Sequence, residues 1–244
     1  MCTVSWKIDR DGYELFFNRD ESLTRLEAMP PQLTVKRGVS VLSPVDADSG
    51  GTWLSINDRG ISCFLLNHYP KPAGNFSMTR GAIVREMMYC THVHEFDDLL
   101  RALDLRSCAP FRFGVVAPGM NPRTWSWNCK ELLFEGDSPT FLSSSGFKPE
   151  SVVPTRLQTM AGATLKTTAD FMALHRSHAP EKSAYSICMH RHDAKTVSFS
   201  RIAVRSELAE FHYTPGSPCE AAESHVTQLR LRSKLETPHD ARVA

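Results

Sequence analysis

The chain has 244 residues, 41% of them hydrophobic, a formal net charge of +1 and seven cysteines. This length and composition predict one domain with its own core, and the near-neutral charge excludes the basic surface of a nucleic-acid-binding protein. No apolar run could form an integral membrane segment, no secretory signal opens the chain, and an odd cysteine count without a Cys-x-x-Cys pair predicts free thiols in the cytoplasm.

The first residues of the chain predict a β-hairpin. Residues 3–8 alternate polar and apolar side chains, and residues 13–17 are again typical of a strand. Between them lies Asp9-Arg10-Asp11-Gly12, which contains the Asp-Gly pair favoured in tight turns. Two registers are compatible with this turn, one with Cys2 opposite Arg19 and one with Cys2 opposite Glu21.

Cys2 is a candidate nucleophile. Methionine aminopeptidases generally remove Met1 before a small residue, which would leave a thiol and an α-amine together on Cys2. The amine has a reference pKa of about 7.7–8.0, so it can act as a base near neutral pH, as covalent acyl transfer requires. The alternative is that Met-Cys occurs by chance.

Both registers return Arg19 and Asp20 to the side of Cys2. Arg19 would lower the pKa of the thiol or hold an anionic group, and Asp20 would orient the terminal amine. The alternative is an ordinary surface ion pair, which contributes under about 1 kcal/mol.

Beyond the hairpin, the first half of the chain predicts mixed elements. Residues 22–31 are helical or irregular, and residues 32–51 form a loop with one short strand near 39–41. Two strands follow, at 52–57 and 61–66, and then two helices, at 79–89 and 95–105.

The second half predicts more strands. Residues 143–165 show no clear periodicity, whereas Thr167 and Asp170 have the spacing of a capping box that opens a helix to about His175. Because the end of the chain is polar, we predict a single domain over residues 1–230 and a flexible tail over residues 231–244. The strands predicted are 111–117, 124–128, 132–134, 141–142, and a hairpin of 185–189 with 196–203. These elements indicate an α+β fold rich in antiparallel strands.

Two blocks resemble the NRDE family, also called the transport and Golgi organisation 2 family. They are Phe17-Asn18-Arg19-Asp20-Glu21-Ser22 and residues 50–60, followed by Asn67. The resemblance runs from Cys2 to about Cys219 and weakens after residue 140. This family is similar to the cysteine N-terminal nucleophile (Ntn) hydrolases, such as penicillin V acylase and bile salt hydrolase. The resemblance therefore implies a four-layer αββα sandwich of Ntn-hydrolase type with antiparallel sheets.

The resemblance also implies roles in catalysis. Cys2, Arg19 and Asp20 would form the catalytic group, and Asn67 would donate a hydrogen bond to the oxyanion. Asn67 ends an apolar strand, and its other interpretation is that of a turn residue at the strand end.

Two further residues are candidates for substrate binding. Asn18 either lines the pocket or caps the end of its strand, and Arg156 is a loose match to a second arginine of the hydrolases. These hydrolases carry another Asn where this chain has Ser143-Ser144-Ser145. Half of the oxyanion site is therefore absent or supplied by backbone N–H groups.

Two functions are compatible with these features of the sequence. The first is hydrolysis of linear carbon–nitrogen (amide) bonds in small acylated molecules, after removal of Met1 and without a cofactor. The second is non-catalytic binding or trafficking of haem or lipid, because the resembled family is connected with haem mobilisation and lipid homeostasis. Aromatic residues could line an apolar pocket or belong to the core: Trp6, Phe16, Phe17, Trp53, Trp125 and Trp127.

Two His-x-His pairs, His92-x-His94 and His190-x-His192, would place both imidazoles on one face of a strand. Neither pair belongs to a fuller ligand pattern. We therefore predict no metal site, and we expect the cysteines other than Cys2 to be small buried hydrophobic residues.

Overall fold

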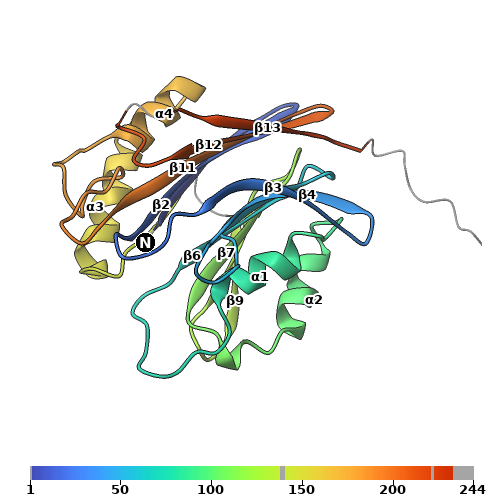
Figure 1. The fold of residues 1–244 in the computed structure, drawn as a ribbon, viewed down its shortest axis with the longest axis horizontal. Helices are drawn as coiled ribbons and strands as arrows, with labels where there is room; N and C mark the ends of the chain where they lie inside the picture. The colour runs from blue at the N-terminus through green and yellow to red at the C-terminus, as the bar shows by residue number, and fades with distance from the viewer. Residues whose placement is uncertain (1, 138–140, 221–222, 233–244) are drawn as a thin grey trace, which may run out of the picture.

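Two antiparallel sheets packed face to face form the centre of the protein (Figure 1). The structure is a computed structural model that describes residues 2–137, 141–220 and 223–232. In the first sheet the strand order is β10-β1-β2-β11-β12-β13, and in the second it is β3-β4-β5-β6-β7-β8-β9. The strands of the first sheet are β1 (Cys2–Asp9), β2 (Gly12–Ser22), β10 (Phe141–Ser144), β11 (Ala194–Arg205), β12 (Leu208–Pro215) and β13 (His225–Arg230). Those of the second are β3 (Met29–Lys36), β4 (Val39–Val45), β5 (Leu54–Asn57), β6 (Ser62–Asn67), β7 (Phe111–Val116), β8 (Arg123–Trp127) and β9 (Leu132–Asp137).

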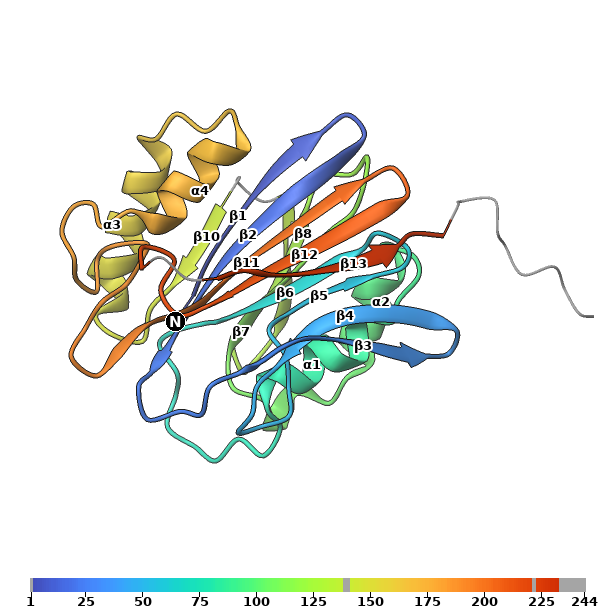
Figure 2. The ribbon, with the colours of Figure 1, turned by 45° about the horizontal axis from the view of Figure 1, so that its top comes forward.

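Helices cover the outer face of each sheet and complete four layers (Figures 1 and 2). The helices are α1 (Arg80–Met87), α2 (Glu95–Ala102), α3 (Pro149–Ala161) and α4 (Thr168–Arg176), with a short 3-10 helix at Leu105–Ser107. Helices α3 and α4 pack on the first sheet, against β10 and β2, and α1 packs on the second, against β6. This arrangement confirms the predicted αββα sandwich with antiparallel sheets.

The main core lies between the two sheets. Trp6 stacks on Phe64 across this layer, with 5.6 Å between ring centroids. The hydroxyl of Tyr13 in β2 also crosses it and hydrogen-bonds Ser62 Oγ of the second sheet at 2.7 Å. Because β2 is covered on both faces, Phe17 points into this core while Phe16 points outward and stacks on Phe171 of α4.

The local predictions that rested on strong signals are confirmed. The turn at Arg10-Asp11 joins β1 to β2, with Asp9 paired to Gly12, and Thr167 with Asp170 makes a complete capping box at the start of α4. The strands predicted at 52–57 and 61–66 are β5 and β6, and the helices predicted at 79–89 and 95–105 are α1 and α2, each slightly shorter.

Several other predicted elements are wrong. Residues 22–31, predicted as helical or irregular, contain no helix and are irregular between β2 and β3. Residues 32–51, predicted as a loop with one short strand near 39–41, have that strand within β4 but carry most of the β3–β4 hairpin. Residues 185–189 form no strand, so the hairpin predicted with 196–203 does not exist. Instead β11 pairs with β2 and β12. A helix, α3, occupies the stretch 143–165 in which no element was predicted.

The chain stays attached to the fold at the end of the last described segment. The Leu231 amide donates to Glu207 O at 2.8 Å, and Arg232 pairs with buried Asp58 at 2.9 Å. The predicted tail at 231–244 lies, from residue 233 onward, outside the described residues. No helix in the described part of the chain has the length and apolar character needed to cross a membrane.

Candidate active site

Cys2 occupies the head of β1, where this strand is paired on both sides. It lies opposite Arg19 of β2 and opposite Ser144 of β10, so the first of the two predicted registers is confirmed. Cys2 is buried, yet it lines a cavity of about 280 Å³ together with Arg19 and Asn67. The hairpin and the end of β6 thus bring together three of the predicted site residues.

The environment of Cys2 keeps its thiol protonated. Burial raises the pKa of the thiol above its usual value, and the negative charge of Asp20 raises it further, while a hydrogen bond from the Asp20 backbone amide acts in the opposite direction. The net shift is upward, so the lowering of this pKa expected from Arg19 is not found. A base must therefore accept the proton before Cys2 can act as a nucleophile near neutral pH.

Arg19 pairs with a carboxylate of the protein itself. Its guanidinium lies 2.5 Å from Asp46 Oδ2 and 4.4 Å from the centre of the Trp53 ring. Asp46 also accepts from Arg25 at 2.6 Å and from the Ser49 amide at 2.9 Å. Desolvation opposes ionisation of Asp46, yet these donors lower the pKa of its carboxyl.

Asp20 lies behind Cys2 in a fully buried ion pair. Its Oδ2 is 3.0 Å from Arg156 Nη1 of α3, and neither side chain is exposed. The other oxygen accepts from Thr196 Oγ1 of β11 at 2.7 Å. Burial raises the pKa of the Asp20 carboxyl, and the charge of Arg156 opposes this rise. Arg156 also donates to Ala184 O at 2.9 Å, so the position predicted to contact substrate instead supports Asp20.

Ser144 contacts the backbone of Cys2. The Cys2 nitrogen donates to Ser144 Oγ at 3.1 Å, and Ser143 Oγ lies 3.0 Å from Thr3 Oγ1. Ser145 Oγ donates to Phe147 O at 2.6 Å. The sequence marked this serine run only as a missing asparagine, and the pairing of β10 with β1 gives Ser144 a role that spacing along the chain could not indicate.

Asn67, the residue expected to donate to the oxyanion, lies between two hollows. It lines the Cys2 cavity and also a neighbouring hollow of about 390 Å³ that includes Ser143 and Ser144. Its Nδ2 donates to Tyr69 Oη at 3.2 Å, which fixes the amide at the boundary of the two spaces. An amide nitrogen carries two hydrogens, so a second donation into the cavity is compatible with this contact.

Asn18 lies on the other face of β2, away from the cavity. Its Nδ2 donates to His175 O and to Ile187 O, both at 2.9 Å, and its Oδ1 lies 3.0 Å from His175 Nδ1. The side chain is fully buried. These contacts favour the structural alternative, in which Asn18 fastens helix α4 and the following loop to the first sheet.

The cavity beside Cys2 is strongly charged. Arg25, Lys71 and Arg80 line it in addition to Arg19, whereas Glu21 and Asp46 supply the carboxylates. Of the six aromatic residues considered from the sequence, Trp53 lines this cavity and the other five are buried core residues. Of the two alternatives for these aromatic residues, a pocket lining or the core, the second therefore holds for five of the six.

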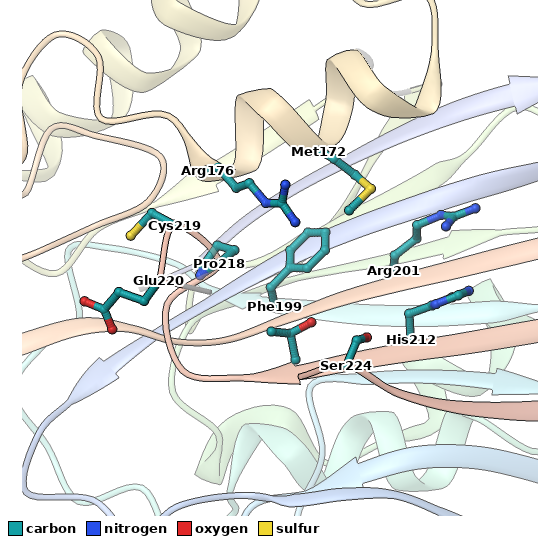
Figure 3. Close-up of a pocket in the computed structure, with 10 residues that line it drawn as sticks. Met172, Arg176, Phe199, Arg201, His212, Pro218, Cys219, Glu220 and Ser224 are labelled. Atoms are coloured by element: carbon teal, nitrogen blue, oxygen red, sulfur yellow. The ribbon is translucent and has the colours of Figure 1, made fainter. Parts of the chain in front are cut away.

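A larger hollow, of about 490 Å³, opens on the outer face of the first sheet beside α4 (Figure 3). It is lined by Phe199 of β11, His212 of β12 and Arg176 of α4, and Cys2 is not among its lining residues. The predicted His-x-His pairs form no ligand set of their own. His92 lies 3.4 Å from Glu95, and the side chain of His192 is 93% exposed.

The layers, the paired N-terminal strand and the cavity at its head define an Ntn-hydrolase fold, and solved structures share it. Conjugated bile acid hydrolase from Clostridium perfringens, as a mutant, has a TM-score of 0.55 and 13% identity over 93% of this chain and 92% of that chain. Penicillin V acylase from Agrobacterium tumefaciens has a TM-score of 0.58 and 9% identity over 94% and 86%. The Caenorhabditis elegans ortholog of N-acylethanolamine-hydrolyzing acid amidase has a TM-score of 0.57 and 15% identity over 83% and 92%.

The family model for Transport and Golgi organisation 2 matches residues 1–127, which is more than half of the chain, and the chain belongs to this family. The matched region contains Cys2, both sequence blocks and Asn67, whereas Ser144 and Arg156 lie beyond it. A comparison with curated protein sequences found no match.

Proposed function

We propose that this protein hydrolyses linear carbon–nitrogen (amide) bonds of small acylated molecules, with Cys2 as the nucleophile after Met1 has been removed. The observation that carries the proposal is the position of Cys2 at the head of β1, buried but open to a cavity that Asn67 also lines. The Ntn-hydrolase fold supports it, although a fold alone does not establish a reaction.

In the proposed reaction the free α-amine of Cys2 takes the proton of the thiol, which the raised thiol pKa makes necessary. The sulfur attacks the amide carbonyl, and Asn67 Nδ2 donates to the oxyanion that forms. The ammonium returns the proton to the leaving nitrogen as the carbon–nitrogen bond breaks. The amine then takes a proton from water as the water oxygen attacks the thioester, and it returns this proton to the Cys2 sulfur as the carbon–sulfur bond breaks and a carboxylic acid leaves.

The residues around Cys2 supply orientation for this step. Ser144 Oγ accepts from the Cys2 nitrogen and would hold the amine near its own thiol. The Asp20–Arg156 pair fixes the strand segment beside it. The four cations of the cavity outnumber its two carboxylates, which suits an amide substrate that carries a negative group. Because the reaction requires a free thiol, we place it in a reducing compartment such as the cytoplasm.

The test begins with the intact mass of the protein before and after brief alkylation at neutral pH. We expect loss of Met1 and one fast alkylation that maps to Cys2. A panel of acyl amides should then be turned over by the wild type and by Cys129→Ser, but not by Cys2→Ala. Retained Met1, labelling spread over all seven cysteines, or turnover that survives Cys2→Ala would contradict the proposal.

A second candidate is binding of haem or lipid without catalysis. The raised pKa of the Cys2 thiol and the cationic cavity favour it, since neither feature requires turnover and the cations suit carboxylate or phosphate groups. This candidate predicts saturable ligand binding by a protein that retains Met1 and cleaves no amide. A haem titration that causes no change in the haem absorption spectrum would exclude haem as the ligand.

A further inference from the structure

Four metal-ligating side chains meet on the side of the first sheet where α3 and α4 pack. One donor atom from each of His178, Cys188, His190 and Cys219 lies within 4.8 Å of all the others. His190 Nε2 is 3.6 Å from Cys188 Sγ and 3.2 Å from Cys219 Sγ. The rings of His178 and His190 meet edge to face, with 5.1 Å between their centroids. Short-range motifs could not reveal this group, because its members are separated by up to 41 positions in the sequence.

We propose that these four residues, two cysteines and two histidines, form a structural zinc site. In tetrahedral zinc sites the ligand atoms lie about 2.0–2.3 Å from the metal, which places them about 3.3–3.8 Å from one another. The two distances given above are close to that range, and small rotations of the side chains would bring the other pairs within it. Two thiolates and two imidazoles are a donor set that selects zinc over the hard cations.

The donors have few competing partners within the protein. His178 Nε2 is buried and has no hydrogen-bond partner in the described residues. The hydrogen bonds of His190 Nε2 go to two sulfur atoms, which are weak partners for an imidazole. A metal ion would satisfy these atoms together and would leave no open coordination position, as in structural rather than catalytic zinc sites.

The site would join two segments that have little regular structure. His178, Cys188 and His190 belong to the long connection between α4 and β11, and Cys219 follows the end of β12. Figure 3 shows the Cys219 sulfur pointing away from Phe199 and Arg176, and so away from the centre of the outer hollow. His178, His190 and Cys219 are partly exposed, so a metal ion would have a path to the site from solvent.

The same segments support the buried pair behind Cys2. Ala184 O, within the connection, accepts from Arg156, and Ile187 O accepts from Asn18. Just before Cys219, Ser217 Oγ donates at 2.7 Å to the carbonyl of Thr196, whose hydroxyl donates to Asp20. A bound zinc ion would therefore fix the wall of protein against which Asp20 is held.

The experiment uses the untagged full-length chain, purified with reductant and without chelator, and measures zinc by elemental analysis after gel filtration. We expect one zinc ion per chain. Replacement by cobalt should give the visible bands of tetrahedral cobalt and a thiolate-to-cobalt charge-transfer band in the near ultraviolet. This spectrum tests the wild type directly, so it does not depend on the folding of any variant.

Variants locate the metal. Cys188→Ser and Cys219→Ser should weaken metal binding by more than tenfold and remove the charge-transfer intensity of their sulfur, whereas His192→Asn and Cys129→Ser should bind as the wild type does. Absence of zinc and of the cobalt spectrum in the reduced protein would overturn the proposal. So would a Cys188–Cys219 disulfide whose reduction gives no metal uptake, since the two thiols would then form a redox pair. None of these readouts requires amide hydrolysis.

Discussion

Asp20 and Arg156 form an ion pair at a position without solvent. Each side chain is completely buried, and the pair is completed by Thr196 Oγ1 on the carboxylate and Ala184 O on the guanidinium. Two charges held in this way need each other, because a buried ion without its counterpart carries the full cost of desolvation. The pair therefore connects α3, β2 and β11 behind Cys2.

Removing one charge of this pair should be far worse than removing both. We expect Arg156→Met to lower the free energy of unfolding by about 3–5 kcal/mol, because it leaves Asp20 buried and unpaired. The double variant Asp20→Asn/Arg156→Met should lose much less. Urea denaturation of the three proteins near neutral pH measures the difference.

The pH dependence of the stability loss in Arg156→Met serves as a control for its cause. Burial already raises the pKa of Asp20, and loss of Arg156 should raise it further, so Asp20 in Arg156→Met should bind a proton in mild acid. The stability difference from the wild type should shrink as the pH falls. A loss that stays constant with pH would mean that packing, rather than the unpaired carboxylate, is responsible.

At the scale of elements, one wall of the Cys2 cavity depends on a close contact between two glycines. A Cβ atom on Gly81, in the first turn of α1, would lie 2.9 Å from Gly51 Cα and 2.9 Å from the Thr52 nitrogen. The Thr52 amide also donates to Gly81 O at 3.4 Å. The second sequence block thus begins where the segment before β5 packs directly on the backbone of a helix.

Gly81→Ala should destabilise the protein even though alanine is the better helix former. Alanine in a helix is favoured over glycine by about 1 kcal/mol, but here the new methyl group would collide with backbone. We expect a net loss of about 1–3 kcal/mol, as in overpacked cores. Urea unfolding should show it, together with a control, Gly162→Ala, where the nearest atom would be 3.4 Å away. A Gly81→Ala protein as stable as the wild type would contradict this contact.

Elements could be predicted where their local signals were strong. The first hairpin turn, at Arg10-Asp11 just before Gly12, and the capping box at Thr167 depend on neighbouring residues only, and both are present. Helix α3 was missed because Pro154 lies inside it and left-handed Lys148 precedes it. Strand β3 was missed because it is an exposed edge strand that begins Met29-Pro30-Pro31 and has no buried face to give alternation.

On the scale of the whole molecule, a buried histidine makes the attachment of the outer helices sensitive to acid. His175 of α4 contacts Ser5 Oγ at 2.8 Å and Asn18 Oδ1 at 3.0 Å, and it packs against Phe16 and Phe199 of the first sheet. Complete burial lowers its pKa to about 3. The imidazole is therefore neutral in the folded protein at any pH above that value.

Folding should weaken as the pH falls below the pKa of His175 in the unfolded chain, about 6.5. Below that pH the unfolded state binds a proton that the folded state does not, so stability is lost progressively between the two pKa values. Between pH 6.5 and 4.5 His175 should contribute a loss of about 2–3 kcal/mol. Denaturation at several pH values should show this loss. His175→Gln should be less stable than the wild type, but its free energy of unfolding should change less with pH. If the stability of His175→Gln depended on pH as steeply as that of the wild type, other titratable groups would be responsible for the effect.

The site as a whole could be predicted only in part. Cys2 and Arg19 were accessible from the sequence because the hairpin places them opposite each other, and Asn67 was accessible through the family resemblance; the three line one cavity. Asp46, Ser144 and Thr196 approach the site through pairings and loops distant in sequence, so no local pattern marked them. The proposed zinc ligands were missed for the same reason, since the connection between α4 and β11 must meet the segment after β12 before their donors come together.

The partners of β1 also have a consequence for synthesis. Cys2 and Ser144 are 142 residues apart in the sequence. At about 5–20 residues per second, a ribosome needs roughly 7–28 s to advance from the first to the second. Throughout that interval the head of β1 lacks the neighbour that later covers one of its edges. The nascent chain therefore remains open there to processing enzymes, and β10 can cover this edge of the strand only after Ser144 has been synthesised.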